Sequence, residues 1–197
     1  MKRKRLFSAV LALALFTGTF ATATQQKAEA YQLQNYRMET QIWYQPHAVF
    51  LQPTKEVFRS SMVTWNAHLP EYRRVCFDWT VHYVSRYPFH DGKNLITKEP
   101  MSDSSVVAQN YYWCNVSLRG NTIVESDINL NYNQQWINGS DSDRYDVQSV
   151  MLHEVGHTVG LDHSEYKSAA MYAYSYKRAI KRSLSQDDID GLNARYQ

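Results

Sequence analysis

Apolar and polar residues along the chain follow two different periods, and each period predicts a different kind of element. Stretches rich in β-branched and aromatic residues with alternating polarity are typical of strands. They occur at residues 40–45, 73–84, 95–100, 104–118 and 121–131. The sequence HDGKN at residues 90–94 and the tripeptide Arg119-Gly120-Asn121 have turn composition. The pattern therefore predicts a sheet joined by short turns.

Three segments have helical spacing instead. In the first, Val57, Met62, Trp65 and Leu69 suit one helix face, with Thr54 as a plausible N-cap after Pro53. The second starts after the N-cap candidate Asp146, and its apolar positions mark a buried helix: Val147, Val150, Met151, Val155 and Val159.

The third helical segment is the last element of the chain. Ser185 caps it, acidic residues fill its first turn, and Arg195 lies near its end. The element order is strand, helix, several strands, helix, loop and helix. This order predicts an α/β (α+β) domain in which a twisted mixed sheet is backed by two helices and followed by a small helical tail.

The first 30 residues have the composition of a secretory signal peptide. Four basic residues (residues 2–5) precede an apolar run from about Leu6 to Phe20, and A-x-A sites follow at residues 21–23 and 28–30. The apolar run is short for a membrane anchor, which needs about 20 residues. We expect cleavage before Tyr31, or alternatively before Thr24. The sequence thus predicts a secreted, extracellular protein with one mature domain over residues 31–197 and no stable membrane span.

Removal of the signal peptide changes the charge. The whole chain has 21 basic and 19 acidic residues, and residues 1–30 hold five of the basic and one of the acidic ones. The remaining 16 and 18 leave a net charge of −2. Nothing in this balance suggests a nucleic-acid partner.

Two cysteines remain, Cys76 and Cys114, and in an oxidising compartment we expect them to form one disulfide. Two buried free thiols or a metal-bound thiolate are the alternatives.

The sequence HEVGHTVGLDH, from His153 to His163, carries candidate metal chemistry. His153 and His157 lie one helical turn apart on one face, where both imidazoles can bind the same zinc ion. Gly160 can end the helix in a left-handed conformation and return the chain, so that His163 becomes the third ligand. Asp162 is the alternative third ligand. No role follows from the sequence for Gly156 except close helix packing.

Glu154 lies beside the first histidine without being a ligand. A catalytic zinc ion needs three protein ligands and an open position for water, whose pKa it lowers to about 7. A carboxylate next to that water can act as general base and return the proton to the leaving amine. The pattern predicts a zinc-dependent endopeptidase with one catalytic zinc ion. A structural zinc site would instead have four protein ligands, usually with cysteine among them.

These residues resemble the metzincin zinc proteases, and among them the matrixins, in the form of small bacterial-type members. HEVGHTVGLDH has the complete HExxHxxGxxH pattern, and AAMY, LSQDDIDGLNARY and IVESDINLN are also similar to the matrixin group. The resemblance implies an upper subdomain over about 40–160 and a lower one over about 161–197. It also implies that Met171 forms a floor beneath the metal and that Tyr172 and Tyr174 shape the substrate pocket.

The resemblance further implies that an extended protein or peptide substrate pairs with an edge strand, for which we select residues 105–113. The usual proline after the MY pair is replaced by Ala173. A bound Ca²⁺ has little support, because Asp141, Asp143 and Asp146 also fit a solvated acidic loop that ends in an N-cap. His90 and Asp91 are read as turn residues. We expect a monomer. The alternative function is a non-catalytic binding or adhesion protein on a metzincin scaffold.

Overall fold

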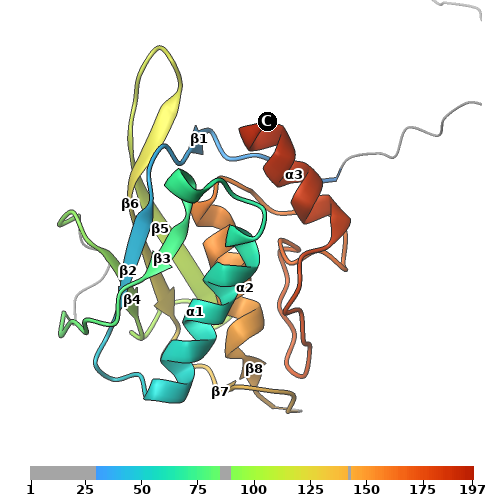
Figure 1. Cartoon of the computed structure of the whole chain (residues 1–197). Helices are drawn as coiled ribbons and strands as arrows, with labels where there is room; N and C mark the ends of the chain where they lie inside the picture. Colours follow the sequence, from blue (N-terminus) through green and yellow to red (C-terminus); the bar gives the residue numbers. More distant parts are fainter. Residues whose placement is uncertain (1–29, 85–89, 142) are drawn as a thin grey trace, which may run out of the picture.

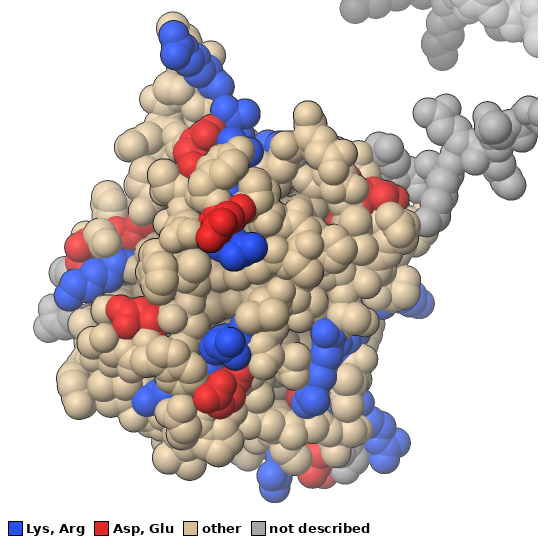
Figure 2. Space-filling view, viewed as in Figure 1, with Lys and Arg blue, Asp and Glu red and all other residues tan. Residues whose placement is uncertain are grey.

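The computed structural model describes residues 30–84, 90–141 and 143–197. The predicted signal peptide, apart from its last residue, lies outside the described residues. Within them, no helix is long and apolar enough to cross a membrane. On the face shown in Figure 2, basic and acidic side chains are interspersed.

The central layer is a six-stranded sheet (Figure 1). Its strands are β1 (Tyr36–Arg37), β2 (Ile42–Pro46), β3 (Val75–Phe77), β4 (Asn94–Thr97), β5 (Ala108–Asn115) and β6 (Asn121–Leu130). The order is β1-β6-β4-β2-β3, and every neighbouring pair on this path is parallel. β5 runs antiparallel to β6 and pairs with no other strand of the described chain. The predicted strand 104–118 is therefore an edge strand, as expected for residues 105–113.

Two long helices lie side by side against one face of the sheet, and a third follows at the end of the chain (Figure 1). They are α1 (Gln52–Asn66), α2 (Val147–Thr158) and α3 (Gln186–Tyr196). Shorter elements are the 3₁₀ helix Glu71–Arg73 and the parallel pair of β7 (Trp136–Ile137) and β8 (Tyr145–Asp146). The predicted α/β class, with a mixed sheet backed by two helices, is confirmed.

The packing of α1 on α2 follows the expected apolar face. Met62 and Trp65 are buried, and the Trp65 indole Nε1–H donates to the Leu152 carbonyl of α2 at 2.8 Å. The predicted cap of α1 was wrong: the N-cap is Leu51, with no side-chain hydrogen bond, and Pro53 occupies the first turn. Proline is tolerated there because the first amides of a helix lack intrahelical partners.

The long strand predicted over residues 73–84 is also shorter than expected. Regular pairing ends after Phe77, and His82 makes only an isolated bridge to His47. The Asp78 backbone amide donates to the Tyr44 carbonyl. The Asp78 carboxylate accepts from the Gln45 side chain and from the Thr80 amide. An aspartate that bonds its own backbone two residues on favours a turn over a strand.

The predicted disulfide between Cys76 and Cys114 was wrong, because both cysteines are free thiols. Cys76 lies on β3 and Cys114 on β5, with β2, β4 and β6 between them. Four strand spacings of about 4.8 Å separate the two strands by about 19 Å. A disulfide needs Cα atoms about 4.4–6.8 Å apart. Of the alternative of two buried free thiols, the free state is confirmed, but both side chains are only partly buried.

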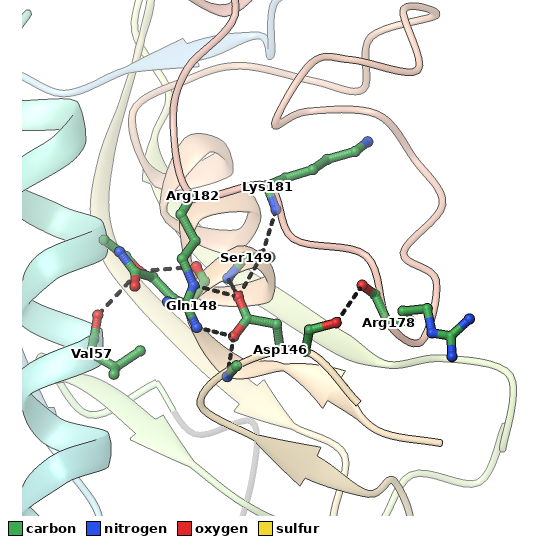
Figure 3. A network of polar contacts seen from close by, with 10 residues as sticks. Val57, Asp146, Gln148, Ser149, Arg178, Lys181 and Arg182 are labelled. Atoms are coloured by element: carbon green, nitrogen blue, oxygen red, sulfur yellow. Dashed lines mark hydrogen bonds and ion pairs between the residues drawn. The ribbon is translucent and has the colours of Figure 1, made fainter. Parts of the chain in front are cut away.

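Asp146 begins α2 as predicted, and its carboxylate is the centre of a polar network (Figure 3). It accepts hydrogen bonds from the Ser149 amide at 3.0 Å, the Ser149 hydroxyl at 2.6 Å and the Gly139 amide at 2.9 Å. Arg182, from the segment before α3, donates through Nε at 2.9 Å and Nη2 at 2.6 Å. The network thus ties the chain before α3 to the first turn of α2.

The same contacts set the pKa of Asp146. Burial alone would raise this pKa, but the hydrogen bonds from Arg182 and Ser149 outweigh burial and lower it below its usual value. A carboxyl group whose pKa is lower in the folded state stabilises the fold above its unfolded pKa of about 3.9. That contribution is lost as the pH falls through the folded pKa.

We predict that Arg182→Met lowers the free energy of unfolding at pH 7 by about 1–2 kcal/mol, because a buried carboxylate loses a bidentate partner. The Arg182 side chain is 34% exposed, so solvent screening limits the loss. The difference from wild type should shrink as the pH falls through the lowered pKa of Asp146. Urea denaturation at pH 7 and at a series of lower pH values measures it. Arg178→Met is the control, because only the backbone of Arg178 joins the network (Figure 3). An equal loss of unfolding free energy in both variants at pH 7 would show that the Arg182 side chain does not stabilise the fold through Asp146.

Candidate active site

The histidines of the HEVGHTVGLDH motif converge as the spacing predicted. α2 presents His153 and His157 one turn apart, and His163 approaches from the loop that follows. One ring nitrogen of each histidine lies within 4.8 Å of those of the other two. Among the described residues this is the one group of three or more histidine, cysteine, aspartate or glutamate side chains with such spacing. Asp162, the alternative third ligand, is not in the group.

Gly160 brings His163 back to the helix. Its φ is +91°, in the left-handed region that glycine adopts without a Cβ penalty. The Gly160 amide donates to the His157 carbonyl at 2.9 Å, and the Leu161 amide donates to the Gly156 carbonyl at 3.0 Å. This pair of bonds is the Schellman motif, which closes a helix and reverses the chain.

The returning loop is held by the segment that precedes β1. The Gln34 amide donates to the Gly160 carbonyl at 3.0 Å, and the Asp162 amide donates to the Gln32 carbonyl at 2.8 Å. Leu33 and Leu161 form the β-bridge between these two bonds. The Asp162 carboxylate accepts from the His163 amide at 2.8 Å. Asp162 therefore supports the backbone of the third histidine.

Backbone carbonyls orient the two helical histidines. The His153 Nδ1–H donates to the Ala170 carbonyl, and the His157 Nδ1–H donates to the Leu161 carbonyl, each at 2.9 Å. A carbonyl can only accept, so Nδ1 of each ring carries the proton and Nε2 keeps a free lone pair. This arrangement is the usual outer support of a metal-binding histidine.

Burial also fixes the charge of these rings. It lowers the pKa of His153 well below its usual value and the pKa of His157 to about 4. Both imidazoles are therefore neutral at pH 7, which is the form that binds a metal ion. Three close imidazoles with free ring nitrogens fit a zinc ion, and no cysteine lies among them to suggest a closed structural site.

Glu154 is buried next to His153 on the same helix and lines the same cleft. Burial raises the pKa of its carboxyl group to about 8. A positive ion within a few ångströms favours the ionised form of such a group. The site therefore places a carboxyl group of raised pKa beside the three imidazoles.

The cleft over these residues has a volume of about 510 Å³. β5 forms one wall, and the loop after Met171 forms the other with Ala173, Tyr174 and Ser175. A cavity of about 20 Å³ adjoins it and shares four lining residues with the cleft, Tyr145, Val150, Tyr174 and Ser175. Of the two predicted pocket residues, Tyr174 lines both spaces, while Tyr172 lines only the smaller one.

Residues 88–197 match the family model of the matrixins. This segment is more than half of the chain, and it contains β5, β6, all three histidines and α3. The chain belongs to the matrixin family. The mixed sheet with its helices is the fold of this family, as the resemblance implied.

Individual relatives match shorter stretches. Metalloendoproteinase 4-MMP of Arabidopsis thaliana is 45% identical over 51 residues, which are 26% of this chain and 15% of the relative. Metalloendoproteinase 1 of Glycine max is 46% identical over 52 residues, 26% of this chain and 17% of the relative. Neutrophil collagenase of Homo sapiens is 38% identical over 74 residues, 37% of this chain and 15% of the relative. The matches thus span less than a fifth of each relative's length.

Met171 of this matrixin packs directly beneath α2. It is buried, and an added Cβ on Gly156 would lie 2.1 Å from the Met171 sulfur and 2.8 Å from Cζ2 of Trp65. Gly156 is therefore needed for close packing, which is the one role that the sequence suggested for it.

Two acidic residues of α3 hold the neighbouring turn, and the sequence did not reveal them as more than first-turn acids. The Asp188 carboxylate accepts from the Ala170 amide at 2.9 Å and the Met171 amide at 3.0 Å, while it also completes the capping box with Ser185. Asp187 accepts from the Ser164 hydroxyl at 2.6 Å and the Tyr31 amide at 3.1 Å. The carbonyl that orients His153 is thus fixed by the cap of α3.

We predict that Gly156→Ala destabilises this matrixin by about 1–3 kcal/mol, the usual cost of overpacking a core. The new methyl group would overlap the side chains of Met171 and Trp65. Thermal unfolding of the wild type, Gly156→Ala, Met171→Ala and the double variant gives the coupling. Because Met171→Ala removes the closest overlap, the double variant should lose less stability than the sum of the single variants. Strict additivity would show that the two residues do not press on each other.

Proposed function

We propose that this matrixin is a secreted zinc-dependent endopeptidase. The single observation that supports it most is the convergence of the rings of His153, His157 and His163 beside the buried carboxyl group of Glu154 in an open cleft. The names of the relatives, two metalloendoproteinases and a collagenase, agree with a peptidase. A binding protein on the same scaffold would have no need to retain Glu154 among the three histidines.

In this proposal His153, His157 and His163 hold one zinc ion through their free ring nitrogens. When bound, zinc supplies positive charge that acidifies water and polarises the carbonyl of the scissile peptide bond. The Ala170 and Leu161 carbonyls keep two of the rings in the required tautomer and orientation. Gly160 and Met171 support this set, the first by reversing the chain and the second by filling the space under α2.

Glu154 is the proposed general base. Its carboxylate would take a proton from the attacking water and then donate that proton to the nitrogen of the leaving amine. No covalent bond to the protein is needed, so a nucleophilic serine or cysteine has no role here. The buried position of Glu154 keeps its proton affinity high enough for the return step.

The proposed substrate is an extracellular protein or peptide in an extended conformation. Among the described strands β5 pairs only with β6, and it lies along the cleft, so a substrate strand would pair with its other side by backbone hydrogen bonds. Tyr174, with Tyr172 behind it, would contact the side chain next to the cleaved bond. We propose that the upper subdomain (about 40–160) and the lower subdomain (about 161–197) meet at this cleft.

Export and assembly complete the proposal. Residues 1–30 would direct secretion and be removed before Tyr31 or before Thr24, and the mature chain would act as a monomer. The proposal assigns no calcium site, since Asp146 serves as the N-cap of α2 and partner of Arg182, and Asp141 accepts from the Asp143 amide at 2.9 Å.

We predict that Glu154→Gln retains one zinc ion per chain but loses about 10²–10⁴-fold in turnover, the usual contribution of a general base. Glutamine keeps the shape and cannot accept the proton. Zinc content by elemental analysis and hydrolysis of a quenched peptide by the purified mature protein test this. Near-normal turnover in the zinc-loaded variant would remove Glu154 from the mechanism, and an inactive zinc-loaded wild type would refute the peptidase itself.

We predict that His163→Ala loses zinc and activity together, whereas Asp162→Ala retains most of both. The ring of His163 belongs to the cluster of three, while the Asp162 carboxylate accepts from the backbone. Zinc titration of both variants at pH 7 separates the two residues. The proposed ligand set would be wrong if Asp162→Ala released the metal while His163→Ala kept it.

A further inference from the structure

A ring of four hydrogen-bonded side chains lies between the sheet and α2. Its members are Tyr44 of β2, Ser126 of β6, Asn110 of β5 and Thr158 of α2. Tyr44, Ser126 and Thr158 are completely buried. Hydrogen bonds between these four side chains thus connect three strands of the sheet to α2.

The hydrogen bonds in this ring have one consistent direction. The Tyr44 hydroxyl donates to Ser126 at 2.5 Å, and the Ser126 hydroxyl donates to the Asn110 Oδ1 at 2.8 Å. The Asn110 Nδ2 donates to the Thr158 hydroxyl at 2.8 Å. Since the Tyr44 proton is already used, the Thr158 hydroxyl donates back to Tyr44 at 2.7 Å. Closed chains of this kind strengthen each member and hold one geometry.

The Asn110 side chain makes a further hydrogen bond outside the ring, to the backbone of the residue that carries the candidate base. The second N–H of its amide donates to the backbone carbonyl of Glu154 at 2.8 Å. Because that carbonyl can only accept, the orientation of the amide is determined. Both donors of the amide point to α2, and its acceptor points to the sheet.

The hydrogen bond from Asn110 to the Glu154 carbonyl matters because Asn110 lies on the strand that borders the cleft. Asn110 and its strand neighbours Ala108, Gln109 and Tyr112 line the cleft, and β5 is the edge strand with which the proposed substrate would pair. At the other end of the contact, the Glu154 carbonyl belongs to the helical turn between His153 and His157. One amide group therefore joins the strand that would set the substrate's register to the turn that carries the acid–base group.

We infer that Asn110 is a positioning residue: it fixes the edge strand β5 relative to the turn of α2 that bears Glu154, and so aligns a bound peptide with the base. This inference rests on the proposed peptidase function. A misplacement of about 1 Å between reacting groups can lower turnover by about 10²-fold. An apolar residue of similar size would fill the space but would remove one hydrogen bond each from Ser126, Thr158 and the Glu154 carbonyl.

The test compares Asn110→Leu with Tyr44→Phe, a matched control. Tyr44→Phe breaks the same buried ring but keeps the Asn110 amide that donates to the Glu154 carbonyl. In zinc-loaded, folded protein, Asn110→Leu should lower kcat by about 10–100-fold with little change in KM, because the peptide still pairs with the edge strand but is misaligned. Tyr44→Phe should change kcat by less than about threefold, although its unfolding temperature should fall by about as much as that of Asn110→Leu.

Amide hydrogen exchange of the metal-free proteins gives a readout without catalysis. Asn110→Leu should speed exchange in β5 and in the last turns of α2 more than Tyr44→Phe does. If Asn110→Leu does not fold, Asn110→Ser serves the same test, because its side chain is too short to reach the Glu154 carbonyl. Equal kcat in the Asn110 and Tyr44 variants, at equal zinc content, would overturn the inference. An inactive wild type would instead overturn the proposed function.

Discussion

The reversal of the chain at Gly160 is the constraint on which the site depends. A helix can present two histidines on one face, but a third group must come from outside it. The left-handed Gly160 and the two amide bonds that close α2 turn the chain back within three residues. An L-residue at φ +91° would be strained, and its Cβ would lie 3.0 Å from the Tyr36 carbonyl. Backbone geometry thus decides that His163 meets His153 and His157.

Around that reversal, α2 is fixed from several directions by polar contacts. The Asp146 network holds its first turn to the chain before α3, and the ring of Tyr44, Ser126, Asn110 and Thr158 holds its last turns to the sheet. The Ala170 carbonyl reaches His153 from a turn that Asp188 secures. Each of these groups is buried or half-buried with its partner present, so each contact resists displacement more than an exposed one would. A rigid helix is what three ligands of one metal ion require.

Burial gives the same helix its chemistry. It keeps His153 and His157 neutral, and it raises the pKa of Glu154 to about 8. The two effects have one cause, since a low-polarity environment disfavours any isolated charge. Neutral rings and a carboxyl group of high proton affinity are suited to binding a cation and to moving protons. The apolar packing of α2 against α1 and Met171 therefore contributes to the site as well as to stability.

The sequence by itself determined the features that depend on local spacing. The i, i+4 histidines, the glycine three residues later and the caps Asp146 and Ser185 all follow from periods and propensities of neighbouring residues. The tertiary structure decided what depends on distant partners. It separated Cys76 from Cys114 by three strands, ended the strand after Phe77, and buried Asp188 beneath the turn at Ala170. It also joined Asn110 to Glu154 across 44 residues of chain. No local pattern contains these contacts, because each arises only when the sheet order brings remote segments together.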